Sequence, residues 1–251
     1  AWKLSPAGVS MFTQNVTELI YGLLVLVFIV DFYQTYQVNK HIFIREVPEF
    51  ERYEFKQVAV LNVLYFTTFG SELAVVSMLP LFFAETFGLG MAQAGMVASS
   101  YAFMNLMSRP GGGWLSDKFG RKSTLLILTA GLAIGYFSVA QIDSSWSLPI
   151  AVVVVMMCSF FVQGGEGAVF AAVPLIKRRL TGQIAGMTGA YGNVGAVFFL
   201  TVYSMVSTQM FFYVIATSAV FGFITLLFMS EPKGHIAEVN EQGEVTLISV
   251  S

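Results

Sequence analysis

The chain of 251 residues is rich in apolar side chains and poor in charge, with 56% hydrophobic residues, 11% charged residues and a formal net charge of −2. Soluble domains carry about 25% charged residues, so this composition indicates a membrane protein that crosses the bilayer several times. The slight negative charge leaves no basic surface for nucleic acid. The single cysteine, Cys158, excludes a disulfide framework, and we expect no metal and no cofactor.

Apolar segments long enough to span a bilayer follow one another along the chain. Each reaches about 20 residues, the length that crosses a hydrocarbon core as a helix. Unpaired backbone polar groups are not tolerated in lipid, and alternating polar strands are absent, so these segments are helices. We therefore predict an all-α polytopic membrane helix bundle with seven spans, at 10–31, 57–84, 91–114, 123–142, 148–174, 183–206 and 210–229.

Basic residues gather on one side of the predicted spans. That side holds Lys40, Arg45, Arg52, Lys56, Lys118, Arg121, Lys122, Lys177, Arg178, Arg179 and Lys233. The other side holds only Lys3, and the positive-inside rule makes it the outer face. We expect a multi-pass protein of the plasma membrane, which is the inner membrane of a bacterial cell, with its C-terminus in the cytoplasm.

The span at 57–84 carries Tyr65, Phe69 and Glu72. Tyr65 and Phe69 are four residues apart and share a helical face, which core packing explains as readily as a binding role. Glu72 is one of two acids well inside the spans, and it can either pair with a cation for structural reasons or take part in function.

Arg109 is the only basic residue placed within a span. It precedes Asp117 by eight residues, about 12 Å along a helix, which is long for a side chain that snorkels to water. Charged residues inside spans usually face a bundle interior or a water-filled path, so we interpret Arg109 as a functional residue.

A charged turn follows this span. Its pattern consists of Gly113, Asp117, Lys118, Gly120, Arg121 and Lys122. A cytoplasmic loop selected only for positive charge would also explain the cations. The spacing resembles the loop signature of the major facilitator superfamily, which implies that these residues form a conformational gate whose contacts break and re-form during alternating access.

The resemblance implies a division of the chain. Residues 57–229 would be the complete C-terminal six-helix half, and 1–31 would hold the last helix of an N-terminal half that is otherwise missing. Residues 32–56 would be the cytoplasmic linker, and 230–251 a cytoplasmic tail. In this architecture two six-helix halves enclose the substrate.

The span at 183–206 contains a glycine series that includes Gly189, Gly192 and Gly195, together with Asn193. Close helix packing is one explanation, since each glycine costs about 1 kcal/mol of helix propensity relative to alanine. The series also resembles the signature of the nitrate/nitrite porter branch of the superfamily. That resemblance implies that these four residues, with Arg109 and the aromatic pair Tyr65 and Phe69, line the site for nitrate or nitrite.

Glu166 lies between glycines in the span at 148–174, and this setting resembles the symporting porters of cyanobacteria and plants. It is our first candidate for the residue that carries a coupled proton, with Glu72 as second. A hydrogen-bonded carboxyl with a structural role is the alternative for Glu166. We therefore predict proton-coupled symport of nitrate or nitrite, with protons and the lipid bilayer as further partners and nitrate assimilation as the wider role.

Other function classes remain to be weighed. The histidines, His41 and His235, lie outside the spans, and no zinc or nucleophile motif is present, so we do not expect an enzyme. A non-transporting nitrate receptor on the same fold, or a transporter for another small solute, stays open. The tail could form a small hairpin, although we expect it to be loosely ordered.

Overall fold

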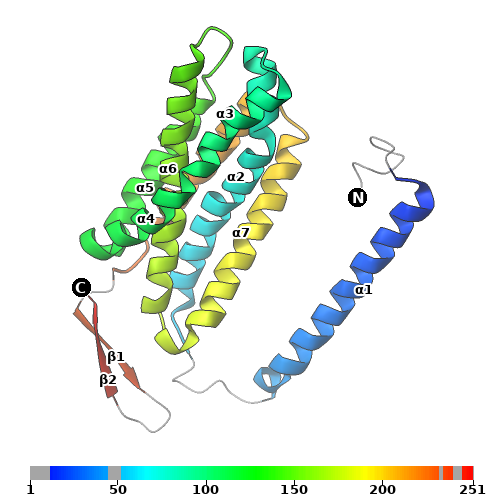
Figure 1. Ribbon diagram of the computed structural model, residues 1–251. Helices are drawn as coiled ribbons and strands as arrows, with labels where there is room; N and C mark the ends of the chain where they lie inside the picture. The colour runs from blue at the N-terminus through cyan, green and yellow to red at the C-terminus, as the bar shows by residue number, and fades with distance from the viewer. Residues whose placement is uncertain (1–11, 45–51, 232–233, 240–244, 251) are drawn as a thin grey trace. The chain divides into compact units, whose positions relative to one another are not determined.

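The computed structural model describes residues 12–44, 52–231, 234–239 and 245–250. Its contacts divide the chain into two units, Ala1–Arg52 and Tyr53–Ser251. The first unit contains α1 (Gln14–Asn39) and a 3-10 turn, η2 (Lys40–Phe43) (Figure 1). Thus α1 continues beyond the expected boundary at residue 31, and the first part of the predicted linker is helical. Thr17 is its buried residue, so the apolar surface of α1 is available to lipid or to other helices.

The second unit is a bundle of long helices that lie side by side (Figure 1). Its elements are α2 (Phe55–Phe87), α3 (Met91–Phe103), α4 (Asn105–Phe119), α5 (Arg121–Val139), α6 (Leu148–Ala172), η4 (Val173–Leu175), η5 (Arg178–Leu180), α7 (Thr181–Tyr203) and α8 (Thr208–Leu226). In the described part of the chain, six helical stretches are long and apolar enough to cross a membrane, namely α1 with η2, α2, α5, α6 with η4, α7 with η5, and α8. The predicted membrane helix bundle is confirmed.

The predicted span at 91–114 is not a continuous helix, and that prediction is wrong. Met104 interrupts it and separates α3 from α4. In an unbroken helix the carbonyl of Tyr101 would accept the N–H four residues later. Here this carbonyl accepts hydrogen bonds from two α6 side chains, the Ser159 hydroxyl at 2.6 Å and the Gln163 amide at 3.2 Å. Polar side chains of a neighbouring helix therefore hold the interruption in place.

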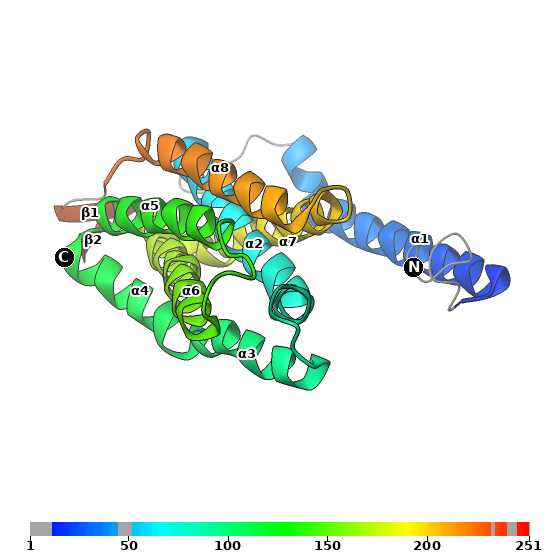
Figure 2. The same ribbon diagram turned by 90° about the horizontal axis from the view of Figure 1, so that it is seen from above.

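The helix α2 is the centre of the bundle. It packs against α7, α3, α6 and α8, which surround it when the bundle is viewed from above (Figure 2). One apolar cluster includes Phe83, Tyr136 and Phe212, and a second includes Leu61 and Ile184. Because lipid is as apolar as these side chains, close packing and interhelical hydrogen bonds must supply the specificity of helix association.

Glycines bring the backbones of α4 and α6 into direct contact. A Cβ atom added to Gly112 would collide with the carbonyl oxygen of Gly164. One added to Gly167 would collide with the carbonyl oxygen of Arg109 and lie 3.1 Å from the amide nitrogen of Gly113. Larger residues would push the two helices apart, so this contact sets how closely the side chains of α4 and α6 can meet.

The turn between α4 and α5 is tied to the end of α8. Gly120 has a φ of 94°, a region that L-residues rarely occupy, and it lets the chain turn sharply into α5. Lys122 Nζ donates to the carbonyl oxygens of Leu227 and Met229 at 2.9 and 2.8 Å, and the Lys122 N–H donates to Glu231 at 3.2 Å. The last helix of the chain is thereby held against the predicted gate loop.

The tail forms a hairpin, so our expectation of a loosely ordered tail is wrong. Strand β1 (Gly234–Val239) pairs antiparallel with β2 (Val245–Val250), with Gly234 opposite Val250 and Val239 opposite Val245. Apolar residues recur in alternation along both segments, which favours strand pairing even though the hairpin is small.

The glycine contact between α4 and α6 predicts a position-specific stability change. Gly112→Ala should destabilise the protein by about 1–3 kcal/mol, because the new methyl group overpacks a backbone contact. Gly111→Ala is the matched control, since a Cβ atom there meets nothing within 4 Å. Thermal unfolding in detergent measures both variants. Equal unfolding midpoints would contradict the proposed contact.

Candidate functional site

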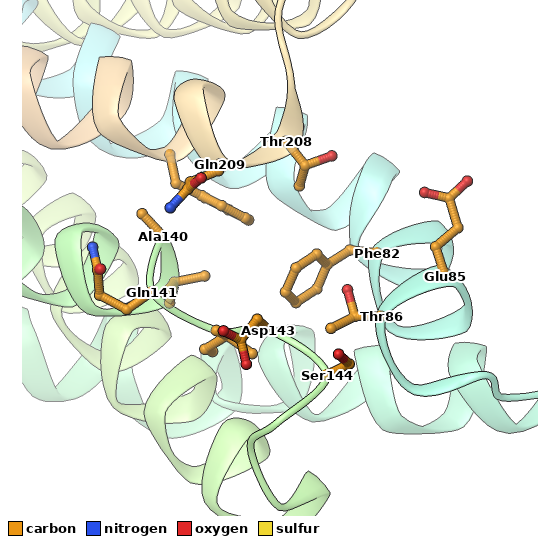
Figure 3. Close-up of a pocket in the computed structure, with 12 residues that line it drawn as sticks. Phe82, Glu85, Thr86, Ala140, Gln141, Asp143, Ser144, Thr208 and Gln209 are labelled. Carbon is orange, nitrogen blue, oxygen red and sulfur yellow. The ribbon is translucent and has the colours of Figure 1, made fainter.

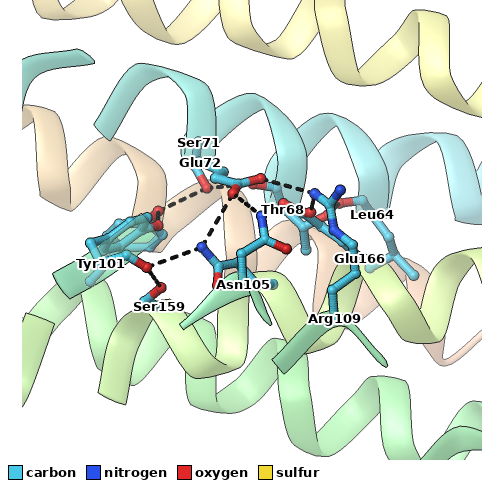
Figure 4. Close-up of polar contacts among 11 residues, drawn as sticks. Leu64, Thr68, Ser71, Glu72, Tyr101, Asn105, Arg109, Ser159 and Glu166 are labelled. Carbon is cyan, nitrogen blue, oxygen red and sulfur yellow. Dashed lines mark hydrogen bonds and ion pairs between the residues drawn. The ribbon is translucent and has the colours of Figure 1, made fainter. Parts of the chain in front are cut away.

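Arg109 lies between two buried carboxylates that come from different helices (Figure 4). Its Nη2 donates to Glu72 Oε2 on α2 at 3.1 Å and also contacts Glu166 Oε2 on α6. The Glu72 and Glu166 side chains are 8% and 1% exposed, whereas Arg109 is 39% exposed. The two carboxylates are therefore sealed in the bundle, while part of the Arg109 side chain is exposed and its Nε atom is buried.

The two carboxylates differ in how well they are satisfied. Glu72 Oε1 accepts from Asn105 Nδ2 at 2.8 Å and from Gln163 Nε2 at 3.2 Å, in addition to the Arg109 bond on Oε2. Glu166 Oε1 is buried and has no hydrogen-bond partner among the described residues. Because buried polar atoms are normally paired, the two acids differ: both oxygens of Glu72 have donors, whereas one oxygen of Glu166 has none.

The aromatic pair predicted from sequence lies beside this cluster. The rings of Tyr65 and Phe69 stack with centroids 5.1 Å apart and planes 7° apart. Phe170 of α6 meets Tyr65 edge-on at 4.9 Å. The Arg109 Cζ atom lies 5.9 Å from the centre of the Phe69 ring, within the range of a cation–π contact. Arginine, aromatic faces and both acids thus belong to one site.

The predicted α7 residues divide into two groups. Gly192 lies against the aromatic pair, since a Cβ atom there would be 2.6 Å from the Tyr65 ring and 2.8 Å from the Phe69 ring. Gly195 instead packs on the backbone of α2, where its Cβ would collide with the carbonyl oxygen of Phe66. Close helix packing accounts for Gly195, and contact with the aromatic pair accounts for Gly192.

Gly189 and Asn193 are not brought to the cluster within this half. Nothing lies within 4 Å of a Cβ atom built on Gly189. The exposed Asn193 side chain donates to the carbonyl of Gly189 at 3.1 Å. Asn193 is exposed on α7 and Gly189 is half-buried, so their predicted role depends on what covers this part of the helix.

Most predicted gate residues lie at the end of α4 and the start of α5, whereas Gly113 lies in the middle of α4 beside Gly167 of α6. Asp117 of α4 and Arg121 of α5 form an ion pair across the turn at Gly120. Lys118 Nζ lies 4.8 Å from the centre of the Trp114 ring. The contact between Lys122 and the end of α8 was not expected from the sequence, because Glu231 lies far along the chain. The gating role itself stays a prediction.

Asn105 and Gln163 are site residues that the sequence reasoning missed. Both hold Glu72, and Asn105 precedes Arg109 by four residues on α4. Gln163 precedes Glu166 by three residues on α6, so both amides share a helical face with a charged site residue. That spacing, applied to polar as well as charged residues, could have identified them.

A cavity of about 490 Å³ opens where α2 and α5 end and α8 begins (Figure 3). Its polar lining includes Glu85, Gln141 and Asp143, and none of the predicted site residues lines it. The hydroxyl and the N–H of Ser145 donate to Asp143 at 2.6 and 2.8 Å, and these bonds lower the pKa of that carboxyl. The cavity is therefore separate from the arginine cluster.

Known proteins are similar to this chain in sequence and in fold. A nitrate/nitrite transporter, NrtP of Picosynechococcus sp., is 47% identical over 264 residues, covering 96% of this chain and 48% of that protein. The NrtP protein of Nostoc punctiforme is 42% identical over 96% of this chain and 49% of its own length. A high-affinity nitrate transporter of Oryza sativa, 2.3, is 38% identical over 55% of this chain and 28% of its own. The chain thus spans about half the length of the cyanobacterial relatives.

The fold comparison agrees. The proton:xylose symporter XylE superposes with a TM-score of 0.54 at 16% identity, covering 70% of this chain and 45% of XylE. The relatives are named as transporters, in agreement with the expectation that the chain is not an enzyme. A sequence model of the Major Facilitator Superfamily matches residues 61–250. The chain belongs to the major facilitator superfamily, and its sequence is similar to nitrate/nitrite transporters of cyanobacteria.

Proposed function

We propose that this chain is the C-terminal part of a nitrate/nitrite transporter that works by alternating access and couples the anion to a proton. The names of the relatives support the substrate. The observation that carries the coupling is the position of Arg109 between Glu72 and Glu166, of which only Glu72 is fully satisfied. In this account the protein lies in the plasma membrane with its C-terminus in the cytoplasm.

The charges of the cluster explain why a proton should accompany the anion. With both acids ionised, Arg109 and its two carboxylates carry a net charge of −1, which repels an anion. A proton on Glu166 removes one negative charge and releases Arg109 from that acid. Nitrate can then take the place of the Glu166 carboxylate beside Arg109. The cluster again carries −1, so proton and anion enter a buried site without a change in net charge.

The shape of the site suits a small planar anion. A guanidinium can bind two oxygens of nitrate or nitrite in a bidentate fork, and lysine offers only a point charge. The Phe69 ring near Arg109 and the Tyr65 ring stacked on it would limit the space beside the anion. A second six-helix half would close the exposed side of Arg109, as the two-half architecture requires.

The fork predicts that charge alone cannot replace Arg109. In the complete transporter, Arg109→Lys should lower nitrate uptake at least about tenfold, because one bidentate contact is worth more than about 1.4 kcal/mol. Arg178→Lys, on an exposed residue of η5, is the control. Radiolabelled nitrate uptake into vesicles is the measurement. Uptake with unchanged KM and rate in Arg109→Lys would overturn the assignment.

Neutralising each acid should have a different result. In Glu166→Gln, Arg109 stays free for the anion, so nitrate exchange should persist while accumulation driven by a pH gradient disappears. In Glu72→Gln, Arg109 loses its fully bonded partner, so both activities should fall. Exchange and accumulation are measured in proteoliposomes. If Glu166→Gln still accumulates nitrate under a pH gradient, Glu166 has a structural role. If the natural protein binds nitrate but does not accumulate it, the protein is a receptor and not a transporter.

The aromatic pair makes the α7 glycines unequal. Gly192→Ala should weaken nitrate uptake, because its methyl group displaces the Tyr65 and Phe69 rings. Gly189→Ala has open space at the same helix and should leave uptake within about twofold of the natural protein. Vesicle uptake compares the two variants. A stronger loss in Gly189→Ala would place the anion on the outer surface of α7 and away from the aromatic pair.

A further inference from the structure

The side-chain amide of Gln163 has a fixed orientation. Its Nε2 donates to Glu72 Oε1 and to the carbonyl oxygen of Tyr101, both at 3.2 Å. A carboxylate and a backbone carbonyl can only accept, so the amide nitrogen, and not the oxygen, must face them. Gln163 is 0% exposed, and its Oε1 is therefore directed elsewhere inside the bundle.

That oxygen is an acceptor without a donor. No described residue donates a hydrogen bond to Gln163 Oε1, and the same is true of Glu166 Oε1. The two residues are three apart on α6 and so lie on one helical face. Both also border the same ion pair, since Gln163 contacts Glu72 and Glu166 contacts Arg109. Two unsatisfied buried oxygens thus belong to residues on the same face of α6, beside the same ion pair.

Protonation of Glu166 resolves this arrangement. When Glu166 is a carboxylate, neither oxygen has a donor, and burial increases the cost of leaving such acceptors unpaired. A proton on Glu166 supplies the missing donor, and an O–H···O bond to Gln163 satisfies both atoms. We propose that Gln163 is a positioning residue that favours proton binding at Glu166 and holds the protonated carboxyl away from Arg109. This inference rests on the proposed proton-coupled function and deepens it.

The other ionisable groups around Glu166 do not offer the same acceptor. The helices packed against α6 bring Tyr65 and Glu72 from α2, Tyr101 from α3, Arg109 from α4 and Tyr136 from α5. Glu72 already accepts three hydrogen bonds. The hydroxyls of Tyr101 and Tyr136 bond to each other at 3.0 Å, and Tyr136 also donates to Ser71.

Gln163 would also connect the two acids. Its nitrogen keeps Glu72 in place as the lasting partner of Arg109, and its oxygen receives the Glu166 hydroxyl. When the proton arrives from solution, the contact between Arg109 and Glu166 is lost and an O–H···O bond forms in its place. Arg109 Nη2 is then free for an anion, and deprotonation reverses the sequence.

The test is the pH dependence of nitrate affinity in the complete transporter. Gln163→Met keeps the length of the side chain but removes both the donor and the acceptor. Asn105→Leu is the matched control. Asn105 also donates to Glu72 Oε1, but the proposal gives it no hydrogen bond with Glu166. Ser108→Ala removes another buried side chain that has no partner, on α4. Nitrate Kd is measured at a series of pH values between pH 5 and 9.

We expect the midpoint of the binding curve to move to lower pH by about one unit in Gln163→Met, a tenfold change in proton activity, with affinity retained at the acid end. Asn105→Leu and Ser108→Ala should not produce this shift. An unchanged midpoint in Gln163→Met, or loss of binding at every pH, would overturn the role of Gln163 and leave proton coupling intact. Binding in the natural protein that does not depend on pH would reject the coupled function itself.

An infrared measurement that keeps Gln163 in place avoids the risk that Gln163→Met fails to fold. The carboxylic C=O stretch of protonated Glu166 is identified in the acid-minus-neutral difference spectrum by its absence in Glu166→Gln. A frequency typical of a hydrogen-bonded carboxyl supports the proposal. A frequency typical of a free carboxyl in apolar surroundings contradicts it.

Discussion

The structure of this half depends on how a positive charge is kept among apolar helices. An unpaired guanidinium in such surroundings is strongly disfavoured, so Arg109 requires acidic partners from neighbouring elements. Glu72 on α2 and Glu166 on α6 provide them, and both need α4 to lie close to these helices. The glycines of α4 and α6 make that approach possible, since Gly112 and Gly164 are in backbone contact. The charge cluster can therefore form only where α4 and α6 pack closely through their glycines.

The same constraint gives the two acids different properties. Glu72 is held by two amides and by Arg109, so its ionised form is satisfied in every respect. Glu166 has only Arg109 among the described residues and keeps one oxygen unpaired. In the proposed function, Glu72 stays paired with Arg109, whereas Glu166 can be replaced beside Arg109 by a dissolved anion. The proposed proton coupling rests on this inequality between two carboxylates at one guanidinium.

Much of this was predictable from sequence because charge and helical spacing are local signals. Arg109, Glu72 and Glu166 were identified by their position in apolar spans, and the aromatic pair by its helical spacing together with the resemblance to the porters. The structure brings them together. The interruption at Met104 was not predictable, because side chains distant in sequence on α6 hold it. Gln163 was missed because helical spacing was considered only for charged and aromatic residues, although it lies three residues before Glu166.

The most direct test of the central claim is the number of protons taken up for each nitrate bound. Calorimetric titration of the complete transporter in buffers of different ionisation enthalpy measures this number. The account predicts that about one proton enters with each anion at a pH where Glu166 is ionised, and that proton uptake falls to about zero in Glu166→Gln while binding remains. Nitrate binding without proton uptake in the natural protein, or undiminished uptake in Glu166→Gln, would contradict it.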